Sequence, residues 1–264
     1  MKMKKLLGMM AGAALLLGMA TQSMAAFEDL KLIRTLYDRS ASVTAEIGTD
    51  LGVDLTTVSG ASGDVGSLVA LSSFTGLSSL SSFVVSYYGF NDAVLNEADY
   101  WITGTADVAP VLLARKGVTL QGIGMQLQDY YAQTGGIADK SHAKAYESAF
   151  DVNGTAFGTF GNTLAAGSLV ANIYLADLAT GDHYVDSYLY FFDYNNRQSG
   201  STTGVQVAQI RTYMTAGADG NYDTLFDNFI GTTINPSAVP VPASLLLFAP
   251  GLLGLIGLRR RNAK

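Results

Sequence analysis

Alternation of apolar and polar residues in the last third of the chain is the feature that most constrains its fold. Residues 169–178, 182–194 and 205–214 each alternate with the period of two that a β-strand produces. The turn Ala179-Thr180-Gly181 and the polar loop 195–204 separate these runs with residues that favour chain reversal. We therefore predict an antiparallel meander of three strands, which places the body of the protein in a mainly β class.

The N-terminal part of the body carries further strand signals. Leu30, Leu32 and Leu36 share one parity within residues 29–37, which indicates a strand. A helix over 28–38 is the alternative, because a short apolar run does not distinguish the two. The polar turn that follows makes this strand the first half of a hairpin. The other expected strands lie at 43–47, 83–88 and 100–105, with a Ser- and Gly-rich loop leading into β structure at 59–82.

One helix is expected across residues 108–134. Pro110 suits the first turn of a helix, and Gly135-Gly136 is a stop signal. Glycines inside the segment lower its helix propensity, so a later start near Val118 is the alternative. A short helix is a further option at 141–150. These elements predict one antiparallel β-sandwich or barrel-like domain of roughly eight to ten strands with one flanking α-helix.

The first 25 residues have the three parts of a secretory signal peptide. Lysines near the start provide a positive region, and residues 6–20 are apolar or small. Ser23-Met24-Ala25 supplies small residues at the two positions that signal peptidase reads, which predicts cleavage after Ala25. A retained N-terminal membrane helix is the alternative.

The C-terminus has the pattern of a membrane stop signal. Residues 239–258 are about long enough to span a bilayer core. The arginines at 259–261 follow directly and are expected to stay on the cytoplasmic side. The predicted organisation is therefore a signal peptide at 1–25, an exported mainly-β domain at 26–235 and a C-terminal sorting signal with a transmembrane helix at 236–264. A single-pass anchor that is never processed is the alternative.

Three features of this tail occur together: the start Pro240-Val241-Pro242, a glycine-punctuated apolar run, and the cluster Arg259, Arg260 and Arg261. In this combination the tail resembles the PEP-CTERM sorting signal of Gram-negative bacteria, with Val241 in place of the glutamate that gives the family its name. The resemblance implies that an exosortase-type membrane protease removes the tail after a transient tether in the inner membrane. It further implies a final place at the cell surface or in an exopolysaccharide or biofilm matrix, and it does not describe the chemistry of residues 26–235.

The charge and the cysteine content of the body limit the classes of partner and site that it can have. The two terminal signals contain seven of the 16 basic residues and none of the 22 acidic ones, so residues 26–235 carry a net charge of −13. Such a body repels phosphate backbones, and nucleic-acid binding is not expected. The chain has no cysteine, which excludes disulfides, zinc–thiolate sites and thiol nucleophiles.

An aromatic row in the predicted strand 182–194 is a candidate sugar platform. Its members share one parity, and flat aromatic faces can stack on sugar rings. The row consists of Tyr184, Tyr188, Tyr190, Phe192 and Tyr194. The opposite parity is also apolar, so a strand buried on both faces is the favoured alternative.

A second candidate site is a calcium loop. Asp219, Asn221 and Asp223 stand at alternate positions, as do the first ligands of an EF-hand loop. Thr224 and Ile230 replace the glycine and the bidentate glutamate of that motif, so an ordinary polar turn is favoured. We expect no cofactor, with Ca²⁺ as the one ion that this spacing suggests.

Catalytic signals are weak. The chain has two histidines: His142 lies in a polar stretch and is expected to be a solvated side chain, whereas Asp186 could orient His183. No Gly-x-Ser-x-Gly motif marks a serine nucleophile. The sequence therefore predicts a non-enzymatic, exported surface or matrix protein. A carbohydrate-binding module that uses the aromatic row is the first alternative, and a secreted hydrolase that uses His183 and Asp186 is the second.

Overall fold

In the computed structural model of the protein, the described residues are 27, 30–91, 99–104, 111–112, 117–150, 172–193, 202–217, 220–222 and 225–236. The strands are β1 (Lys31–Asp38), β2 (Ala45–Asp54), β3 (Gly63–Ala70), β4 (Phe83–Phe90), β5 (Tyr100–Gly104), β6 (Val111–Leu112), β7 (Ile137–Asp139), β8 (Ile173–Tyr174), β9 (Tyr184–Phe192), β10 (Thr202–Thr203), β11 (Val205–Thr215) and β12 (Phe229–Ile234). The helices are α2 (Gly117–Thr134) and α3 (Tyr146–Phe150), with short 3₁₀ turns η1 (Val58–Gly60), η2 (Leu71–Ser73), η3 (Ala176–Ala179) and η4 (Leu225–Asp227).

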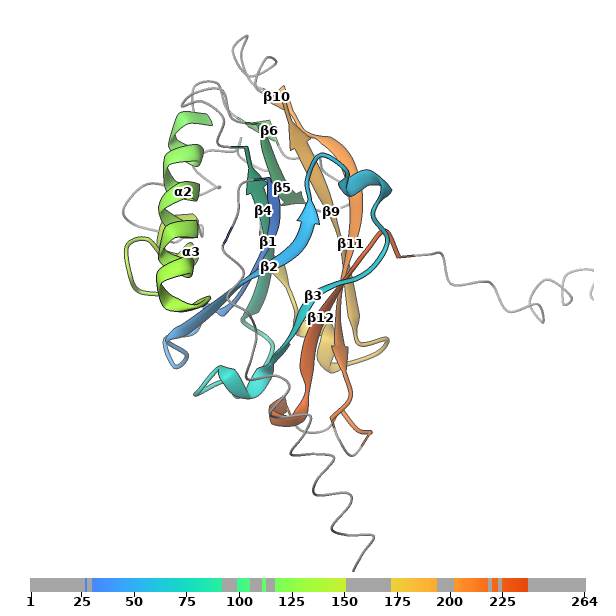
Figure 1. Ribbon diagram of the computed structural model, residues 1–264. Coiled ribbons are helices and arrows are strands. Elements are labelled where there is room, and N and C mark those ends of the chain that lie inside the picture. The colour runs from blue at the N-terminus through green and yellow to red at the C-terminus, as the bar shows by residue number, and fades with distance from the viewer. Residues whose placement is uncertain are drawn as a thin grey trace, which may run out of the picture.

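Ten of these strands form one curled sheet. Its order is β3-β12-β11-β9-β5-β4-β1-β2-β7, with β8 paired to β4, and the pairings are antiparallel. β6 and β10 form a separate pair. The sheet curls until β2 and β3 lie side by side without a hydrogen-bonded ladder, and Gly66 of β3 packs against Leu51 of β2 (Figure 1). The mainly antiparallel β prediction is confirmed, and the described part is one curled sheet rather than a pair of stacked sheets.

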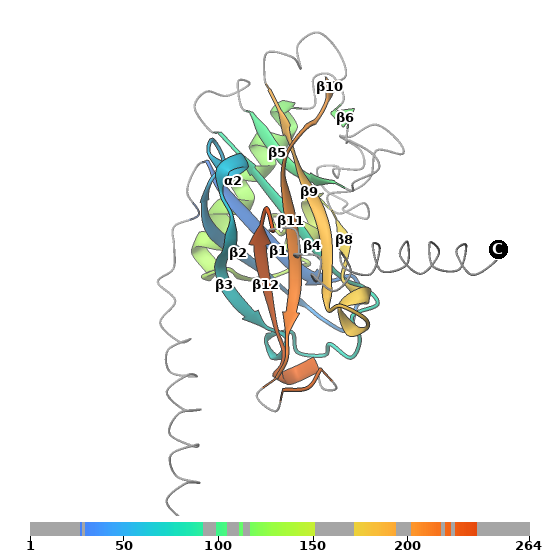
Figure 2. The same cartoon turned by 90° about the vertical axis from the view of Figure 1, so that its right-hand side faces the viewer.

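The two faces of the sheet bury different cores. The inner face, inside the curl, is filled mostly by Leu, Val and Ile side chains. The outer face is covered over β1, β4 and β5 by α2 and α3, and the core there is rich in tyrosine and phenylalanine. Figure 2 looks onto β3, β12, β11 and β9 from the side away from α2, and no described α-helix covers them there.

Helix α2 ends as its sequence predicts. Gly135 (φ 67°) and Gly136 (φ 82°) adopt left-handed conformations, and the amide of Gly136 donates to the carbonyl of Tyr131 at 2.8 Å. This is the Schellman arrangement, in which a glycine without a Cβ closes the last turn. The helix starts at Gly117, close to the later of the two predicted starts, because Val111–Leu112 pairs with β10 as a strand.

Most of the early strand predictions are confirmed. β1 and β2 form the expected hairpin, so the helical alternative for 28–38 is wrong. The strand predicted at 169–178 is wrong in its described part: only Ile173–Tyr174 is a strand, and it pairs with β4. Leu175 and Leu178 are buried at either end of a 3₁₀ turn, whose three-residue period also fits their spacing. The neighbours of β9 are therefore β5 and β11.

Asn235 fastens the end of the last strand to the body. Its backbone amide donates to the carbonyl of Gln209 at 2.7 Å, and its side-chain oxygen accepts from the amide of Gln209 at 2.9 Å. Its side-chain nitrogen donates to the carbonyls of Val58, Ser59 and Ala61 at 3.2, 3.3 and 2.8 Å. We call this arrangement the Asn235 clasp. It stands one residue before the predicted start of the tail at 236.

Apart from Pro236, the two predicted targeting segments lie outside the described residues. These segments include the cleavage position Ala25 and the sorting residues Pro240, Val241, Pro242, Arg259, Arg260 and Arg261. Within the described ranges, no helix is both long enough and apolar enough to cross a membrane.

Candidate functional site

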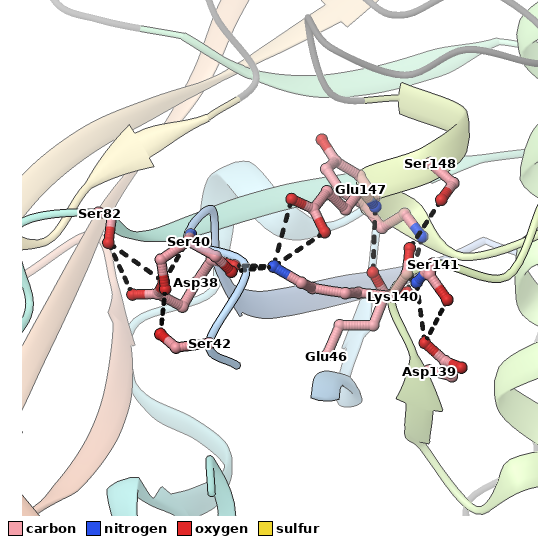
Figure 3. A network of polar contacts seen from close by, with 11 residues as sticks. Asp38, Ser40, Ser42, Glu46, Ser82, Asp139, Lys140, Ser141, Glu147 and Ser148 are labelled. Carbon is pink, nitrogen blue, oxygen red and sulfur yellow. Dashed lines mark hydrogen bonds and ion pairs between the residues drawn. The ribbon is translucent and has the colours of Figure 1, made fainter. Parts of the chain in front are cut away.

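Glu46 is a fully buried carboxylate on the helix-covered face of the sheet. It lies on β2 and accepts hydrogen bonds from the Tyr131 hydroxyl at 2.8 Å and from the amides of Tyr146 and Glu147 at 2.7 and 3.0 Å. The two amides belong to the first turn of α3, so Glu46 caps that helix from the sheet (Figure 3). Burial raises the pKa of Glu46 to about 7, although the three hydrogen bonds act in the opposite direction.

Small residues on the sheet make room for this contact. A Cβ at Gly48, two residues after Glu46, would lie 2.3 Å from the Tyr131 ring. The bare backbone therefore lets α2 approach β2 closely enough for Tyr131 to reach the carboxylate. The same hydroxyl also contacts the Thr35 hydroxyl on β1 at 3.0 Å. Tyr131 thus joins α2 to two strands at once.

Lys140 forms a second polar junction beside Glu46. Its buried ammonium lies 3.2 Å from the Glu147 carboxylate and donates to the carbonyls of Asp38 and Ser40 (Figure 3). The Asp38 carboxylate accepts from the Ser82 hydroxyl at 2.9 Å. The amine is thus surrounded by two carbonyls and a carboxylate of the chain itself. The junction ties the segment between β7 and α3 to the end of β1.

The inner face of the same hairpin holds a buried cation. Arg34 on β1 is fully enclosed and donates to Ser67 O at 2.7 Å, to the Thr232 hydroxyl at 3.0 Å and to the Thr49 hydroxyl at 3.4 Å. These partners are neutral and lie on β3, β12 and β2. Burial lowers the pKa of Arg34, but an arginine remains charged in a protein. Arg34 therefore bridges the seam between β2 and β3 where the ladder is missing.

The predicted aromatic row does not form one exposed platform. Tyr190 and Phe192 are 3% and 0% exposed and belong to the core beneath the helices, whereas Tyr184 and Tyr188 are half-buried. Tyr194 lies outside the described residues. The sugar-platform candidate therefore does not extend to Tyr190 and Phe192, whose burial agrees with the favoured alternative of a buried strand, because α2 and α3 cover that end of the sheet.

The structure does not bring His183 and Asp186 together as a catalytic pair. The Nδ1 atom of His183 lies 2.8 Å from the Leu178 carbonyl, and its ring stacks on Tyr222 with centroids 3.6 Å apart. Both oxygens of Asp186 accept from Arg211, at 2.7 and 2.8 Å. Each residue therefore has its own structural partner.

The calcium prediction falls mostly outside the described residues. Asp219 and Asp223 are not among them, and the carbonyl of Asn221 accepts from the amide of Gly217 at 2.9 Å. Within the described part of the chain, no group of three or more His, Cys, Asp or Glu side chains is placed to hold a metal ion.

Sequence reasoning missed Glu46, Tyr131, Lys140 and Arg34 as a set. The partners of Glu46 lie 85 to 101 residues away in the chain, so no local pattern announces them. For Arg34 a signal was present, because it shares the parity of Leu32 and Leu36 and must face the same core. Comparisons with known proteins found no matching family model, no matching curated protein and no matching solved structure.

Proposed function

We propose that this protein is an exported, non-enzymatic component of the cell surface or extracellular matrix of a Gram-negative bacterium. The observation that carries the proposal is the tail, in which Pro240-Val241-Pro242, the apolar run and the three arginines follow one another. Its partners are an exosortase-type protease and, transiently, the inner membrane, with exopolysaccharide as the medium in which the body is placed.

The position of the Asn235 clasp supports the idea that the tail can be removed without disturbing the body. Five hydrogen bonds fix residue 235 to two other parts of the body, so the end of β12 is fastened to the body just before the predicted tail begins. Removal of residues beyond 236 would therefore leave these contacts intact. A passenger that survives loss of its tail is what a processed sorting signal requires.

The buried polar groups support a structural role for the body. Glu46, Lys140 and Arg34 each bind groups of the chain itself and link separate elements of the sheet and helices. The polar groups of such networks serve the stability of the fold. A catalytic group must instead be able to contact its substrate. The net charge of −13 and the lack of cysteine suit a soluble exported domain.

The test is the intact mass of the protein from its producing cells, measured separately for membranes and medium. We expect a species that lacks residues 1–25 and the apolar run, recovered outside the inner membrane. Replacement of all three arginines at 259–261 by glutamine should leave a longer species in the membrane or mislocalise it. Lys264→Gln, which also removes one tail charge, is the matched control and should process normally. A full-length tail ending in Lys264 on all the wild-type protein would sink the proposal.

A further inference from the structure

The outer face of β9 and β11 carries three facing pairs of side chains. Tyr184 lies opposite Tyr213, Asp186 opposite Arg211, and Tyr188 opposite Gln209 in the strand register. Residues two apart on a strand point to the same face, so these pairs form successive rungs on one surface. Figure 2 shows these strands on the side of the molecule that no described α-helix covers.

The central rung is held rigidly. Arg211 donates two hydrogen bonds to Asp186, at 2.7 and 2.8 Å, and its guanidinium lies 3.7 Å from the centroid of the Tyr184 ring. A planar guanidinium that is stacked and bound at two points loses little further freedom when a ligand arrives. Its charge and that of Asp186 are mutually satisfied.

Tyr213 lies flat across the neighbouring strand. A Cβ at Gly231 of β12 would be 2.3 Å from the Cζ atom of Tyr213, so the ring occupies the space above the bare backbone. The ring is only half-buried, and its phenol interacts with Asp64 of β3, which also accepts from the Thr233 hydroxyl at 2.6 Å. Side chains from β9, β11, β12 and β3 therefore contact one another across this face.

We propose that this surface, defined by Tyr184, Asp186, Tyr188, Arg211 and Tyr213 and called the outer-face platform, binds a neutral polysaccharide. Half-exposed tyrosine rings offer their hydroxyls to sugar oxygens, and the ring faces that Arg211 and Gly231 do not cover can contact the C–H faces of sugars. The fixed Arg–Asp pair between the rings offers donors and acceptors in a set geometry. The inference deepens the proposed function, on which it rests, by naming the class of partner that an exported body would meet.

Charge and shape select this class of ligand. Asp64, Asp182 and Asp186 lie on or beside the platform, and Arg211 is the one cation within the described strands β3, β9, β11 and β12, so the surface disfavours anionic polymers. A small molecule gains most of its affinity in a concave site, whereas the platform is built from strands of one sheet. A long uncharged chain can instead contact several rungs at once, which adds weak contacts together.

The test uses the full chain, purified in mild detergent, in nondenaturing gels that contain one polysaccharide each. The neutral probes are hydroxyethyl cellulose, barley β-glucan, galactomannan and dextran, and alginate is the anionic control. We expect at least one neutral polymer to retard the protein and alginate to have no effect. Tyr184→Ala and Tyr213→Ala should each raise the dissociation constant at least tenfold. Tyr174→Ala removes a tyrosine that is 48% exposed on β8, outside the platform, and should bind as the wild type does.

Fluorescence of Trp101, the single tryptophan, checks that each variant is folded, because this side chain is 5% exposed in the inner core. If Tyr213→Ala unfolds, Tyr184→Ala and Arg211→Gln carry the test. The proposal is overturned if no neutral polymer retards the wild type or if Tyr174→Ala weakens binding as strongly. Self-association that Tyr184→Ala abolishes, without polymer binding, would assign the platform to a second copy of the chain and would also overturn it. Since binding is measured on purified protein, these outcomes do not depend on whether the tail is processed.

Discussion

The β1–β2 hairpin buries a positive charge on one face and a negative charge on the other, and the two faces treat these charges differently. Arg34 points into the aliphatic interior and binds three neutral groups. Glu46 points to the tyrosine-rich side and binds a hydroxyl and two amides. Among the described residues, neither Arg34 nor Glu46 binds an opposite charge, so both are stabilised by the dipoles of neutral groups.

Because one buried charge is an arginine and the other a carboxylate, the helix-covered face can respond to pH near neutrality and the inner face cannot. A guanidinium stays protonated whatever its surroundings, so the interior has to supply acceptors permanently. A carboxylate can instead take up a proton when burial makes its charge too costly, and burial raises the pKa of Glu46 to about 7. We therefore expect the inner core to be insensitive to pH near neutrality and the helix-covered face to respond.

The largest effect should come from Arg34→Ala. Truncation removes the link between β1, β2, β3 and β12 and leaves a cavity with unsatisfied acceptors, which should lower the free energy of unfolding by roughly 3–5 kcal/mol. Chemical denaturation followed by Trp101 fluorescence measures it. Arg211→Ala is the matched control on the exposed face and should cost about 1 kcal/mol or less. Equal losses of unfolding free energy for the two variants would contradict the idea that Arg34 stabilises the contact between β2 and β3.

Glu46 should make stability depend on pH with a defined sign. The folded pKa of about 7 lies above the ordinary 4.5, so the protonated form stabilises the fold. That contribution is complete below pH 4.5 and is lost as pH rises through 7, a loss of about 3 kcal/mol. Unfolding free energies at pH 5 and pH 8.5 measure it, and Glu46→Gln should abolish most of the difference. Glu147→Gln, which alters the more exposed neighbouring carboxylate, should keep most of it. A wild-type stability that rises over this range would contradict the expected sign.

The smallest effect should come from Gly48→Ala. The added Cβ would meet the Tyr131 ring at 2.3 Å and push α2 away from β2, at a cost of about 1–3 kcal/mol. Thermal unfolding measures the loss. Gly60→Ala is the control, because nothing lies within 4 Å of its Cβ and its φ is negative, and it should be neutral or slightly stabilising. A similar loss at both positions would point to backbone effects instead of the Tyr131 contact.

The sequence predicted the positions of strands and helices better than it predicted which strands pair in the sheet. β9 and β11 follow from alternation and lie side by side as expected, and Gly135-Gly136 ends α2 as expected. The placement of β5 beside β9 could not be read, because their pairing joins residues about 90 apart in the chain. A period of two identifies a strand but carries no information about its partner.

The candidate sites were harder to predict than the strands. Parity placed Tyr184, Tyr188, Tyr190 and Phe192 on one face of β9, but parity alone does not say where a helix will cover the strand. Tyr213 and Arg211 complete the outer-face platform from the neighbouring strand, so they become visible only with the register of β9 and β11. The sequence around Glu46 gave no signal of its role, because its hydrogen-bond partners lie on α2 and α3, far away in the chain.

The Asn235 clasp also limits how far the folded body can lie from the predicted membrane segment. Four residues, 236 to 239, separate Asn235 from Pro240 at the start of the Pro-x-Pro motif, and an extended chain over these five steps reaches at most roughly 18 Å. In the proposed sorting, the folded body would therefore stand almost against the bilayer while the tail is still attached. A membrane protease would have to work in that narrow gap, and extra residues before Pro240 would act as a spacer that sets how readily the body is released.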